Sequence, residues 1–551
     1  MYRAKSVSRV RDRVARSRLM RWCAVSKAVT GLRRMAILPA GELWGALEML
    51  AFGQTIRQSI RNVKDPLHVT ARSGLLVLGL RTSPEVGDRS TFGQEHVISV
   101  FEMLHTSYSF ALAYEADLVA GLLERLPLDS RSVVLDPFCG TGTTLLESKL
   151  HGVPSIGVDA NPVCVLVSRA KTEWTLNVSK TKALVESVLA SASDEYDSFV
   201  RRYEKARALG ARHSPQSDPL FTRSPAGTYL LTSGLIRRGW ISPRPALKAL
   251  LIAERLWKLR GREQRFLFLS LLGLLVPDIS NMSYGPEIYK ARYRTDPDVF
   301  RLFETRAEEN LDKLEALRAT GRKASARVRL ADSVNGGLQF LEASGVDAVV
   351  TSPPYLSDHD YTRLTRLELV FSGAVTSKQT LRSLKENLLR SSSKNVYKDD
   401  SFAELVKRFA SVRAVIREVG KQAASRASGF ARVYPKLVGE YFGGMYKHFQ
   451  ALGRVIRVGG RAAYVVGDQS SFFATPIPTA KILAQLAEAC GADLHVVSME
   501  PVREYRGTRG RVTWSNKEWV ILLQKGRSTS VPKVVPKEGR HAGRRRKPAR
   551  A

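Results

Sequence analysis

The chain has 551 residues, 44% of them apolar, which is enough for a large buried core that we expect to be divided over two or more domains. Its formal net charge of +34 predicts a polyanionic partner, nucleic acid first and an anionic membrane surface second. The four cysteines are scattered, which disfavours a disulfide framework and a cysteine metal site. No apolar run reaches about 18 residues, which disfavours a membrane-spanning helix.

Both ends of the chain are strongly basic. Residues 1–35 contain eleven Lys and Arg against one Asp, and residues 526–551 contain nine against one Glu, so that +16 remains on the body. We expect residues 1–97 to be a basic extension of unknown fold and residues 526–551 to be a disordered basic tail. Because the cysteines are unpaired and no signal-type apolar segment follows the N-terminus, we expect a cytoplasmic, nucleoid-associated protein.

The pattern becomes regular from residue 98. Apolar residues at helical spacing predict a helix over 110–126, and a short apolar run predicts a strand over 132–136. A glycine-rich segment, a helix over 143–150 and a strand over 155–159 follow. Strand, glycine turn, helix and strand in this order form a βαβ unit, which implies a parallel sheet.

A long excursion separates this unit from the next strands. Residues 176–322 are mostly helical by period, with clear helices over 248–259 and 263–276, the second of them buried. They include the basic, aromatic stretch SYGPEIYKARYR at 283–294, which suits phosphate binding and stacking but equally a solvated helix face. We interpret the excursion as an insertion with a possible role in target recognition.

Strands and helices alternate again after residue 323. Strands are predicted over 326–332, 346–350, 461–468, 493–500 and 518–524, and helices over 438–457 and 478–490. Residues 362–430 are predicted to form a second polar, basic insertion, which is a rival location for target recognition. The whole predicts an α/β fold with a doubly wound, mostly parallel sheet, in which residues 98–175 and 323–525 form one discontinuous domain.

The first chemical motif is VVLDPFCGTGT at 133–143. Asp136 ends a predicted strand, and Gly140 and Gly142 let the backbone turn sharply and approach a ligand before a helix begins. Asp159 ends the next strand, where an acid can accept hydrogen bonds from both hydroxyls of a ribose. The loop is not GxGxxG and no Walker lysine follows, so it does not suggest phosphate cradling. A tight turn with a surface Asp is the structural alternative.

The second motif is TSPPY at 351–355, directly after the apolar run VDAVV. Two prolines at a strand end lack the backbone N–H groups that would donate hydrogen bonds, and they stiffen the segment that follows the strand. An aromatic residue comes directly after them. A turn alone would be better served by Gly, Asn or Asp. The structural alternative is a proline turn with a packed Tyr.

DPFCGTGT, VDAN and TSPPY together resemble the motifs of amino-group DNA methyltransferases, which use S-adenosylmethionine to methylate N4 of cytosine or N6 of adenine. The resemblance covers roughly residues 98–175 and 326–525. It implies a Rossmann-like class I methyltransferase fold, S-adenosyl-L-methionine as cofactor, and double-stranded DNA whose target base is flipped out. A cognate restriction nuclease is a possible partner, and neither a membrane nor a metal is expected.

The resemblance also implies roles for individual residues. Ser352 and the carbonyl of Pro353 accept hydrogen bonds from the base amino group, which favours a pyramidal, nucleophilic nitrogen. Pro354 stiffens the loop, and Tyr355 stacks on the base. The residues implied to bind the cofactor are Asp136, Phe138, Gly140, Thr141, Gly142, Asp159, Asp332, Ser107 and Tyr108. The segment around the last two, residues 104–119, lacks the proline-rich pattern of the family.

The sequence leaves open whether the target amino group is N4 of cytosine or N6 of adenine. Serine at the first position of TSPPY favours cytosine N4, although adenine N6 enzymes share the architecture. Cytosine C5 chemistry needs a Pro-Cys nucleophile, which the sequence lacks, so Cys139 is interpreted as a small filler. An RNA or tRNA base-amine methyltransferase and a non-catalytic DNA-binding protein are alternatives from other classes, and the intact motifs argue against the second.

Charged residues near the motifs have weaker assignments. His359 and Asp360 lie just after TSPPY, beyond the short segment 356–358, and are interpreted as exposed loop residues, not as general bases, because the amino proton can leave to solvent. Four arginines near the end of the predicted sheet are candidates for contacts with the DNA backbone: Arg503, Arg506, Arg509 and Arg511.

Overall fold

The structure is a computed structural model. It describes residues 105, 107–108, 114–209, 214–285, 287–425, 429, 431–470, 472–473, 475–509 and 512–527, and the backbone of three short strands before them. For residues 505–509 and 512–515 only the backbone is described. The predicted basic extension lies outside the described residues except for those three strands, and so does the predicted basic tail beyond Arg527.

The three early strands form a small antiparallel sheet of their own. Its strands are β1 (Leu67–Arg72), β2 (Leu75–Leu80) and β3 (Val97–Ser99), in the order β1-β2-β3. The apolar run LLVLGL, which fits none of the motifs, is therefore the central strand of this sheet.

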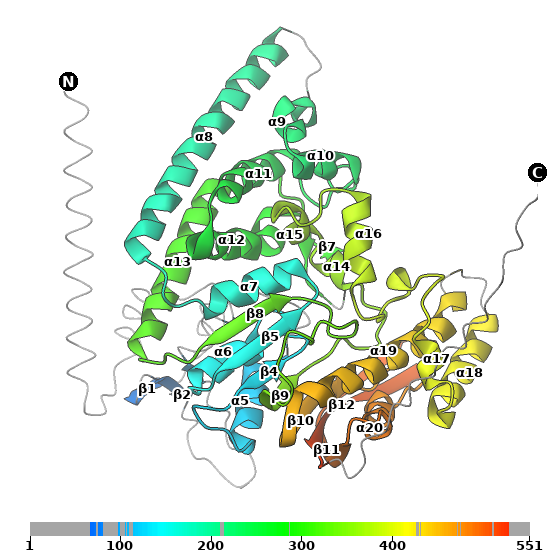
Figure 1. Ribbon diagram of the computed structural model, residues 1–551. Helices are drawn as coiled ribbons and strands as arrows, with labels where there is room; N and C mark the ends of the chain where they lie inside the picture. The colour runs from blue at the N-terminus through cyan, green and yellow to red at the C-terminus, as the bar shows by residue number, and fades with distance from the viewer. Residues whose placement is uncertain are drawn as a thin grey trace, which may run out of the picture. The chain divides into compact units, whose positions relative to one another are not determined.

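The main sheet has seven strands in the order β11-β12-β10-β9-β4-β5-β8 (Figure 1). These are β4 (Val134–Asp136), β5 (Ser155–Asp159), β8 (Ala326–Leu330), β9 (Val346–Thr351), β10 (Ile456–Gly467), β11 (Leu494–Arg509) and β12 (Val512–Lys525). β9 pairs parallel with β4 and β10, and β5 with β8, whereas β12 is antiparallel to β10 and β11. The predicted α/β, Rossmann-like fold with a mostly parallel sheet is confirmed.

The chain divides into two compact units. Unit 1 comprises residues 1–131, 136–331 and 360–388, and unit 2 comprises residues 132–135, 332–359 and 389–551. The predicted insertion over 176–322 falls within unit 1, together with β5 and β8. The predicted domain boundaries stay a prediction.

The helices next to the glycine-rich segment of unit 1 begin and end at clear signals. They are α5 (Ala116–Arg125), α6 (Thr143–Leu150) and α7 (Pro162–Thr172). α6 ends just before Gly152, which adopts a φ of +77°. α7 begins after Asn161, whose side chain accepts a hydrogen bond from the backbone N–H of Val163, with Pro162 in the first turn.

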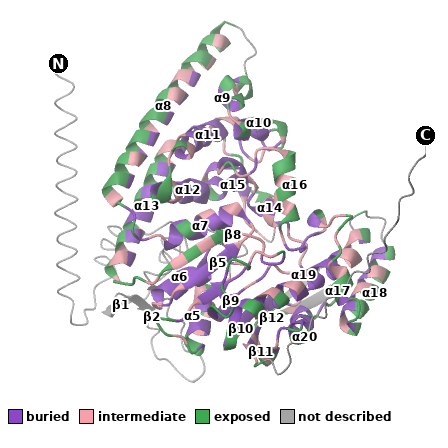
Figure 2. Ribbon diagram, viewed as in Figure 1, coloured by how far each residue is buried: buried purple, intermediate pink, exposed green. Residues whose placement is uncertain are grey.

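The excursion after these helices is mostly helical, as predicted. It contains α8 (Val178–Ala208), η1 (Pro215–Ser217), α9 (Pro219–Thr222), α10 (Pro225–Thr232), α11 (Pro243–Lys258), α12 (Gly261–Leu274), η2 (Leu275–Ile279) and α13 (Val299–Ala319). Most residues of α11 and α12 are buried (Figure 2), which confirms the buried helix predicted over 263–276. Among the described residues, no helix combines the length and the apolar character needed to cross a bilayer.

The stretch 283–294 is not a helix. Met282–Ser283 (β6) and Tyr289–Lys290 (β7) pair as a short antiparallel ladder, with Ser283 opposite Tyr289. The solvated helix face considered for this stretch is therefore wrong, because two β-paired segments close a loop around Gly285 instead.

The polar, basic insertion expected over 362–430 stays a prediction, but its first part contains three short helices. Here lie α14 (Tyr361–Leu364), α15 (Arg366–Phe371) and α16 (Lys378–Glu386) of unit 1. The apolar side chains of α15 belong to the same core as those of α11 and α12. The basic composition of the whole stretch conceals these few apolar residues, so an average over it misrepresents the helix.

Unit 2 combines five strands with helices from the C-terminal part. Its helical elements are η3 (Ser393–Asn395), α17 (Ala403–Val406), α18 (Ala410–Ala424), η4 (Ala431–Val433), α19 (Tyr434–Val455) and α20 (Thr479–Ala489). β10 begins at Ile456, earlier than the predicted 461, and its pairing with β9 shifts register between Ile456 and Arg461. Gly459, with a φ of +78°, permits this irregularity.

Candidate active site

The glycine loop after β4 is held together by the carboxylate of Asp136. This carboxylate is fully buried and accepts hydrogen bonds from the backbone N–H of Phe138 at 3.1 Å and from the hydroxyl of Thr144 at 2.6 Å. The hydroxyl of Tyr114 lies 3.4 Å from the same carboxylate and also contacts the hydroxyl of Thr144. Asp136 thus links the start of the loop to the first turn of α6 and holds the loop in position.

Gly142 is required by both its backbone conformation and its surroundings. It caps α6 with a φ of +84°, and a Cβ built on it would lie 2.9 Å from the hydroxyl oxygen of Ser168. That hydroxyl donates to the carbonyl oxygen of Gly140 at 2.7 Å. Ser168 of α7 therefore supports the loop, and any larger residue at position 142 would push the loop away from α7.

Asp159, at the end of β5, holds the other side of the same loop. One carboxylate oxygen accepts from the N–H of Gly140 at 2.8 Å, and the other accepts from the N–H of Asn161 at 2.7 Å. A carboxylate has about four lone-pair sites, so acceptor capacity remains for two further donors. Burial raises the pKa of Asp159 to about 6, although these two hydrogen bonds act in the opposite direction.

The remaining loop residues are enclosed to different degrees. Thr141 is buried and Phe138 is half-buried. Cys139 is buried as well, and burial together with the charge of Asp159 raises the pKa of its thiol well above the ordinary value. A protonated, enclosed thiol is a poor nucleophile, so the interpretation of Cys139 as a filler agrees with its environment.

Ser107 and Tyr108 lie among the helices of unit 1. Tyr108 belongs to the core of the helical excursion, and its hydroxyl donates to the carboxylate of Glu368 at 3.4 Å. The hydroxyl of Tyr284 donates to the same carboxylate oxygen at 2.9 Å. Glu368 is fully buried, and burial raises its pKa to about 7. The proposed contact of Ser107 and Tyr108 with the cofactor stays a prediction.

The TSPPY loop of unit 2 contains a short chain of hydrogen bonds. The hydroxyl of Ser352 donates to the phenolic oxygen of Tyr355 at 3.3 Å, and the hydroxyl of Tyr355 donates to the carboxylate of Glu518 on β12 at 2.7 Å. Because each proton is directed toward the next oxygen, the lone pairs of the Ser352 oxygen are left as acceptors. This is the orientation that the predicted role of Ser352 requires.

The ring of Tyr355 is also fixed by its packing. A Cβ built on Gly467, at the end of β10, would lie 3.0 Å from one carbon of the Tyr355 ring and 3.1 Å from the next. Gly467 and Glu518 are partners in the β10–β12 ladder, so one cross-strand pair contacts both the ring and the hydroxyl of Tyr355. Pro353 is buried and Pro354 is half-buried beside it.

The far end of the loop is anchored by Asp358. Its carboxylate accepts from the N–H of Ser393 at 2.7 Å and from the hydroxyl of Tyr434 at 3.0 Å. Its φ of +63° places the backbone in the left-handed region that Asp tolerates better than most residues. The loop is therefore clamped at both ends, by Glu518 and by Asp358.

Two acidic residues near the motifs serve local structure. Asp360 was expected to be exposed, and this is wrong: it is buried, caps α14 and pairs with Lys385 at 2.7 Å, because a helix start and a cation both need its carboxylate. In Asp332, one oxygen accepts from the N–H of Val334 at 2.8 Å and the other from the side chain of Asn335 at 2.6 Å. The predicted contact of Asp332 with the cofactor adenine stays a prediction.

Sequence reasoning missed three residues that organise these loops: Tyr114, Asp358 and Glu518. Tyr114 stands inside the segment 104–119 and Asp358 three residues after TSPPY, so a search for polar side chains next to each motif would have found them. Glu518 lies 163 positions from Tyr355, and no local signal marks it. Of the four candidate arginines, Arg503 is exposed on β11, whereas Arg511 and the side chains of Arg506 and Arg509 lie outside the described residues.

β4 and β9, the strands after which the two motifs follow, are neighbours in the strand order. From β4 the sheet continues through β5 to β8 on one side, and from β9 through β10 on the other. β4 and β9 are parallel, with Leu135 opposite Val349, so the chain leaves both strands at the same edge of the sheet. Open α/β sheets bind ligands at the carboxyl ends of strands where the order reverses.

Comparison with known proteins relates this chain to methyltransferases. No family model matches the chain. The chain is 22% identical over 420 residues to the Type II methyltransferase M.BsoBI of Geobacillus stearothermophilus, and the match covers 71% of this chain and 79% of that protein. This relation spans most of both chains and supports methyltransferase activity.

Solved structures give a weaker likeness. Two structures of the rRNA methyltransferase aviRa from Streptomyces viridochromogenes are 11% and 12% identical to this chain, with TM-scores of 0.26 and 0.25. Each match covers 77% of this chain and 92% of the other. A likeness this low carries no argument about substrate.

Proposed function

We propose that this protein is a DNA methyltransferase that moves a methyl group from S-adenosylmethionine to an exocyclic amino nitrogen of a flipped base, with cytosine N4 as the favoured target. The observation that carries the proposal is the hydrogen-bond chain from Ser352 through Tyr355 to Glu518 in the loop that follows β9. It gives the tyrosine of the motif a defined partner and directs the hydroxyl proton of Ser352 toward that tyrosine.

The residues of the glycine loop fit an S-adenosylmethionine molecule. A Cβ built on Gly140 would meet no atom within 4 Å, so the backbone there faces open space that a ligand can occupy. Asp159 keeps acceptor capacity for the two ribose hydroxyls beyond its bonds to Gly140 and Asn161. Phe138, half-buried, supplies an apolar surface beside them.

The TSPPY loop acts on the base. Amino nitrogens of nucleobases are weak nucleophiles, because their lone pair is delocalised into the ring. Ser352 and the carbonyl oxygen of Pro353 each accept a hydrogen bond from the amino group, which favours a pyramidal nitrogen with an available lone pair. When bound, S-adenosylmethionine supplies an electrophilic methyl group, so that a nitrogen–carbon bond forms as a carbon–sulfur bond breaks. The surplus amino proton leaves to solvent.

DNA is favoured as the substrate by the charge and by the similarity to a Type II methyltransferase. The net charge of +34 provides the electrostatic attraction that polyphosphate binding requires. The flipped base is expected to stack on the ring of Tyr355. Ser352, in place of an aspartate, favours cytosine N4 over adenine N6.

The test is methyl transfer from radiolabelled S-adenosylmethionine to DNA and to RNA, followed by nucleoside analysis. We expect label in DNA alone, as N4-methylcytosine. N6-methyladenine would keep the enzyme class and change the base. Label in RNA alone would contradict the DNA assignment, and cofactor binding without transfer to either polymer would indicate a non-catalytic nucleic-acid-binding protein. A possible nuclease partner is tested by co-purification from the native source.

A further inference from the structure

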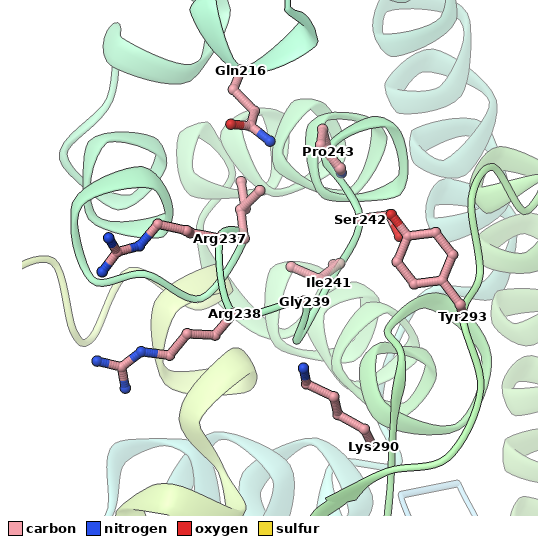
Figure 3. Close-up of a pocket in the computed structure, with 10 residues that line it drawn as sticks. Gln216, Arg237, Arg238, Gly239, Ile241, Ser242, Pro243, Lys290 and Tyr293 are labelled. Carbon is pink, nitrogen blue, oxygen red and sulfur yellow. The ribbon is translucent and has the colours of Figure 1, made fainter.

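The helical part of unit 1 contains a cavity that neither motif explains. Its volume is about 530 Å³, within the range of ordinary ligand sites. Ten residues line it: Gln216, Ile236, Arg237, Arg238, Gly239, Ile241, Ser242, Pro243, Lys290 and Tyr293 (Figure 3). They come from η1, from the turn between α10 and α11, from the first residue of α11, and from the segment at and after β7.

Three cations stand around this cavity without acidic partners. Arg237, Arg238 and Lys290 are exposed, and within the described part of the chain none of them forms an ion pair. The adjacent cations behave differently, since Arg244 and Lys248 both pair with Asp296, at 3.1 Å and 2.7 Å. Unneutralised charge is therefore concentrated at the cavity and is available to an anion.

The frame of the cavity is built by a buried asparagine. The backbone N–H of Asn281 donates to the carbonyl of Trp240 at 2.9 Å, and its side chain donates to the carbonyl of Gly239 at 3.2 Å. Its side-chain oxygen accepts from the N–H of Arg294 at 2.6 Å. Asn281 thus ties the turn that carries Arg237 and Arg238 to the segment that carries Lys290 and Tyr293.

The charge at this cavity comes from side chains and not from a helix end. α11 begins beside it, but Pro243 and Pro245 in its first turn lack N–H groups and cannot donate to an anion. Tyr293 is 71% exposed at the rim, an unusual position for a large aromatic side chain in the absence of a partner. Its hydroxyl can donate to a phosphate and its ring can lie against a sugar or base.

We propose that this cavity binds the phosphate backbone of DNA outside the target base, with Arg237, Arg238 and Lys290 contacting phosphates and Tyr293 contacting the adjoining nucleotide. The assignment of DNA rests on the proposed function, whereas the polyanion chemistry rests on the cavity itself. Contacts of this kind position a duplex without reading its sequence.

The experiment compares full-length wild type with a triple variant, Arg237→Ala, Arg238→Ala and Lys290→Ala. Equilibrium binding to a duplex of arbitrary sequence is measured over a salt series by fluorescence anisotropy. Each lost phosphate contact lowers the slope of log K against log salt by about 0.9, so we expect a decrease of roughly 2 to 3 and at least tenfold weaker binding near 0.1 M salt. A slope equal to that of wild type would overturn the proposal.

A matched control removes the same charge elsewhere on unit 1. Arg322, Lys323 and Arg327 are exposed beyond the C-terminal end of α13, a 21-residue helix that spans roughly 30 Å. Their replacement by alanine is expected to reduce the slope by less than about 1. An equal loss in both triple variants would overturn the assignment to the cavity, since net charge alone would account for the binding.

Two further arms separate the sources of the phosphate. Inorganic phosphate or a mononucleotide, each added in excess, should not displace the duplex from the wild-type protein. If either displaces the duplex at the same concentration at which it binds the protein alone, the site belongs to a small anion. A larger loss of affinity for RNA than for DNA would overturn the DNA assignment.

Failure of this inference is distinguishable from failure of the proposed function. If wild type methylates DNA and the cavity variant shows unchanged KM for DNA and unchanged salt slope, the cavity inference alone fails. If wild type binds DNA through the cavity but methylates no DNA, the proposed function alone fails. We expect the cavity variant to raise KM for DNA while kcat at saturating DNA changes little.

Discussion

The hydroxyl of Tyr355 donates a hydrogen bond of 2.7 Å to the carboxylate of Glu518, a residue that lies 163 positions further along the chain on the opposite strand of the β10–β12 ladder from Gly467. Gly467 in turn leaves room for the ring of Tyr355. The tyrosine of the TSPPY loop is thus held by its ring and by its hydroxyl through residues of two neighbouring strands.

Glu518 is expected to be a positioning residue. Glu518→Ala leaves the Tyr355 hydroxyl without this acceptor, so the Ser352 proton is no longer directed away from the base, and we expect kcat to fall roughly tenfold with KM for the cofactor unchanged. Glu518→Gln keeps an acceptor oxygen and should restore most of the rate. Exposed Glu404→Gln in unit 2 serves as the control. A similar loss of kcat in all three variants, or a raised KM for the cofactor in Glu518→Ala, would contradict this role, because it would indicate general damage to the fold.

Asp159 predicts that cofactor affinity depends on pH. Its pKa lies near 6, and only the ionised carboxylate keeps acceptor sites for both ribose hydroxyls. Affinity for S-adenosylmethionine should therefore be constant above about pH 7 and decline as pH falls through 6. Isothermal titration calorimetry between pH 5 and pH 8 measures this dependence. In Asp159→Asn the decline should disappear; an identical decline in that variant would contradict the role of Asp159.

Gly142→Ala is expected to destabilise the protein. The new side chain would have to adopt a φ of +84° and approach Ser168 to 2.9 Å, at a cost of about 2 kcal/mol. Gly121, within α5, is the matched control, because a Cβ built there would meet no atom within 4 Å. Gly121→Ala should leave the free energy of unfolding unchanged or raise it by up to about 1 kcal/mol. Equal effects of the two changes in urea titrations would contradict the account of the loop.

Glu368 makes the stability of unit 1 depend on pH. Its pKa in the folded protein is about 7, above the ordinary value of 4.5, so the folded state binds the proton more tightly than the unfolded state. Between pH 4.5 and pH 7 the free energy of unfolding must therefore decrease as pH rises, by on the order of 3 kcal/mol for this group. Glu368→Gln imitates the neutral carboxyl and should be more stable than wild type at pH 8 but similar at pH 4.5. The same difference at both pH values would contradict this role.

The sequence predicted the parts of the protein that local patterns encode. The exits of β4 and β9 were found because apolar runs end there in Asp136 and in Ser352, and the α/β class followed from the alternation of strands and helices. The sequence could not indicate that Tyr355 meets Glu518, because that contact depends on strand pairing between distant segments. Nor could it show that Asp360 is buried, since the burial arises from Lys385 and the start of α14.

The structure differs from the sequence-based expectation in two further stretches, where a pattern taken over many residues conceals local features. The basic residues of 362–430 outweighed the apolar side chains of α15, which pack in the core of unit 1. The stretch at 283–294 was open between a binding surface and a helix face, and only the pairing of β6 with β7 excludes the helix. Arg237 and Arg238 belong to no motif, so the sequence did not single them out. They line the same cavity as Lys290 and Tyr293 because Asn281 joins the two segments.

The most direct test of the central claim measures cofactor binding and single-turnover methyl transfer to DNA for wild type and for Ser352→Ala. If the Ser352 hydroxyl accepts a hydrogen bond from the base amino group, the dissociation constant for S-adenosylmethionine stays the same while the transfer rate falls by roughly a hundredfold or more. An unchanged transfer rate, or an equal loss of cofactor binding and transfer, would contradict the claim.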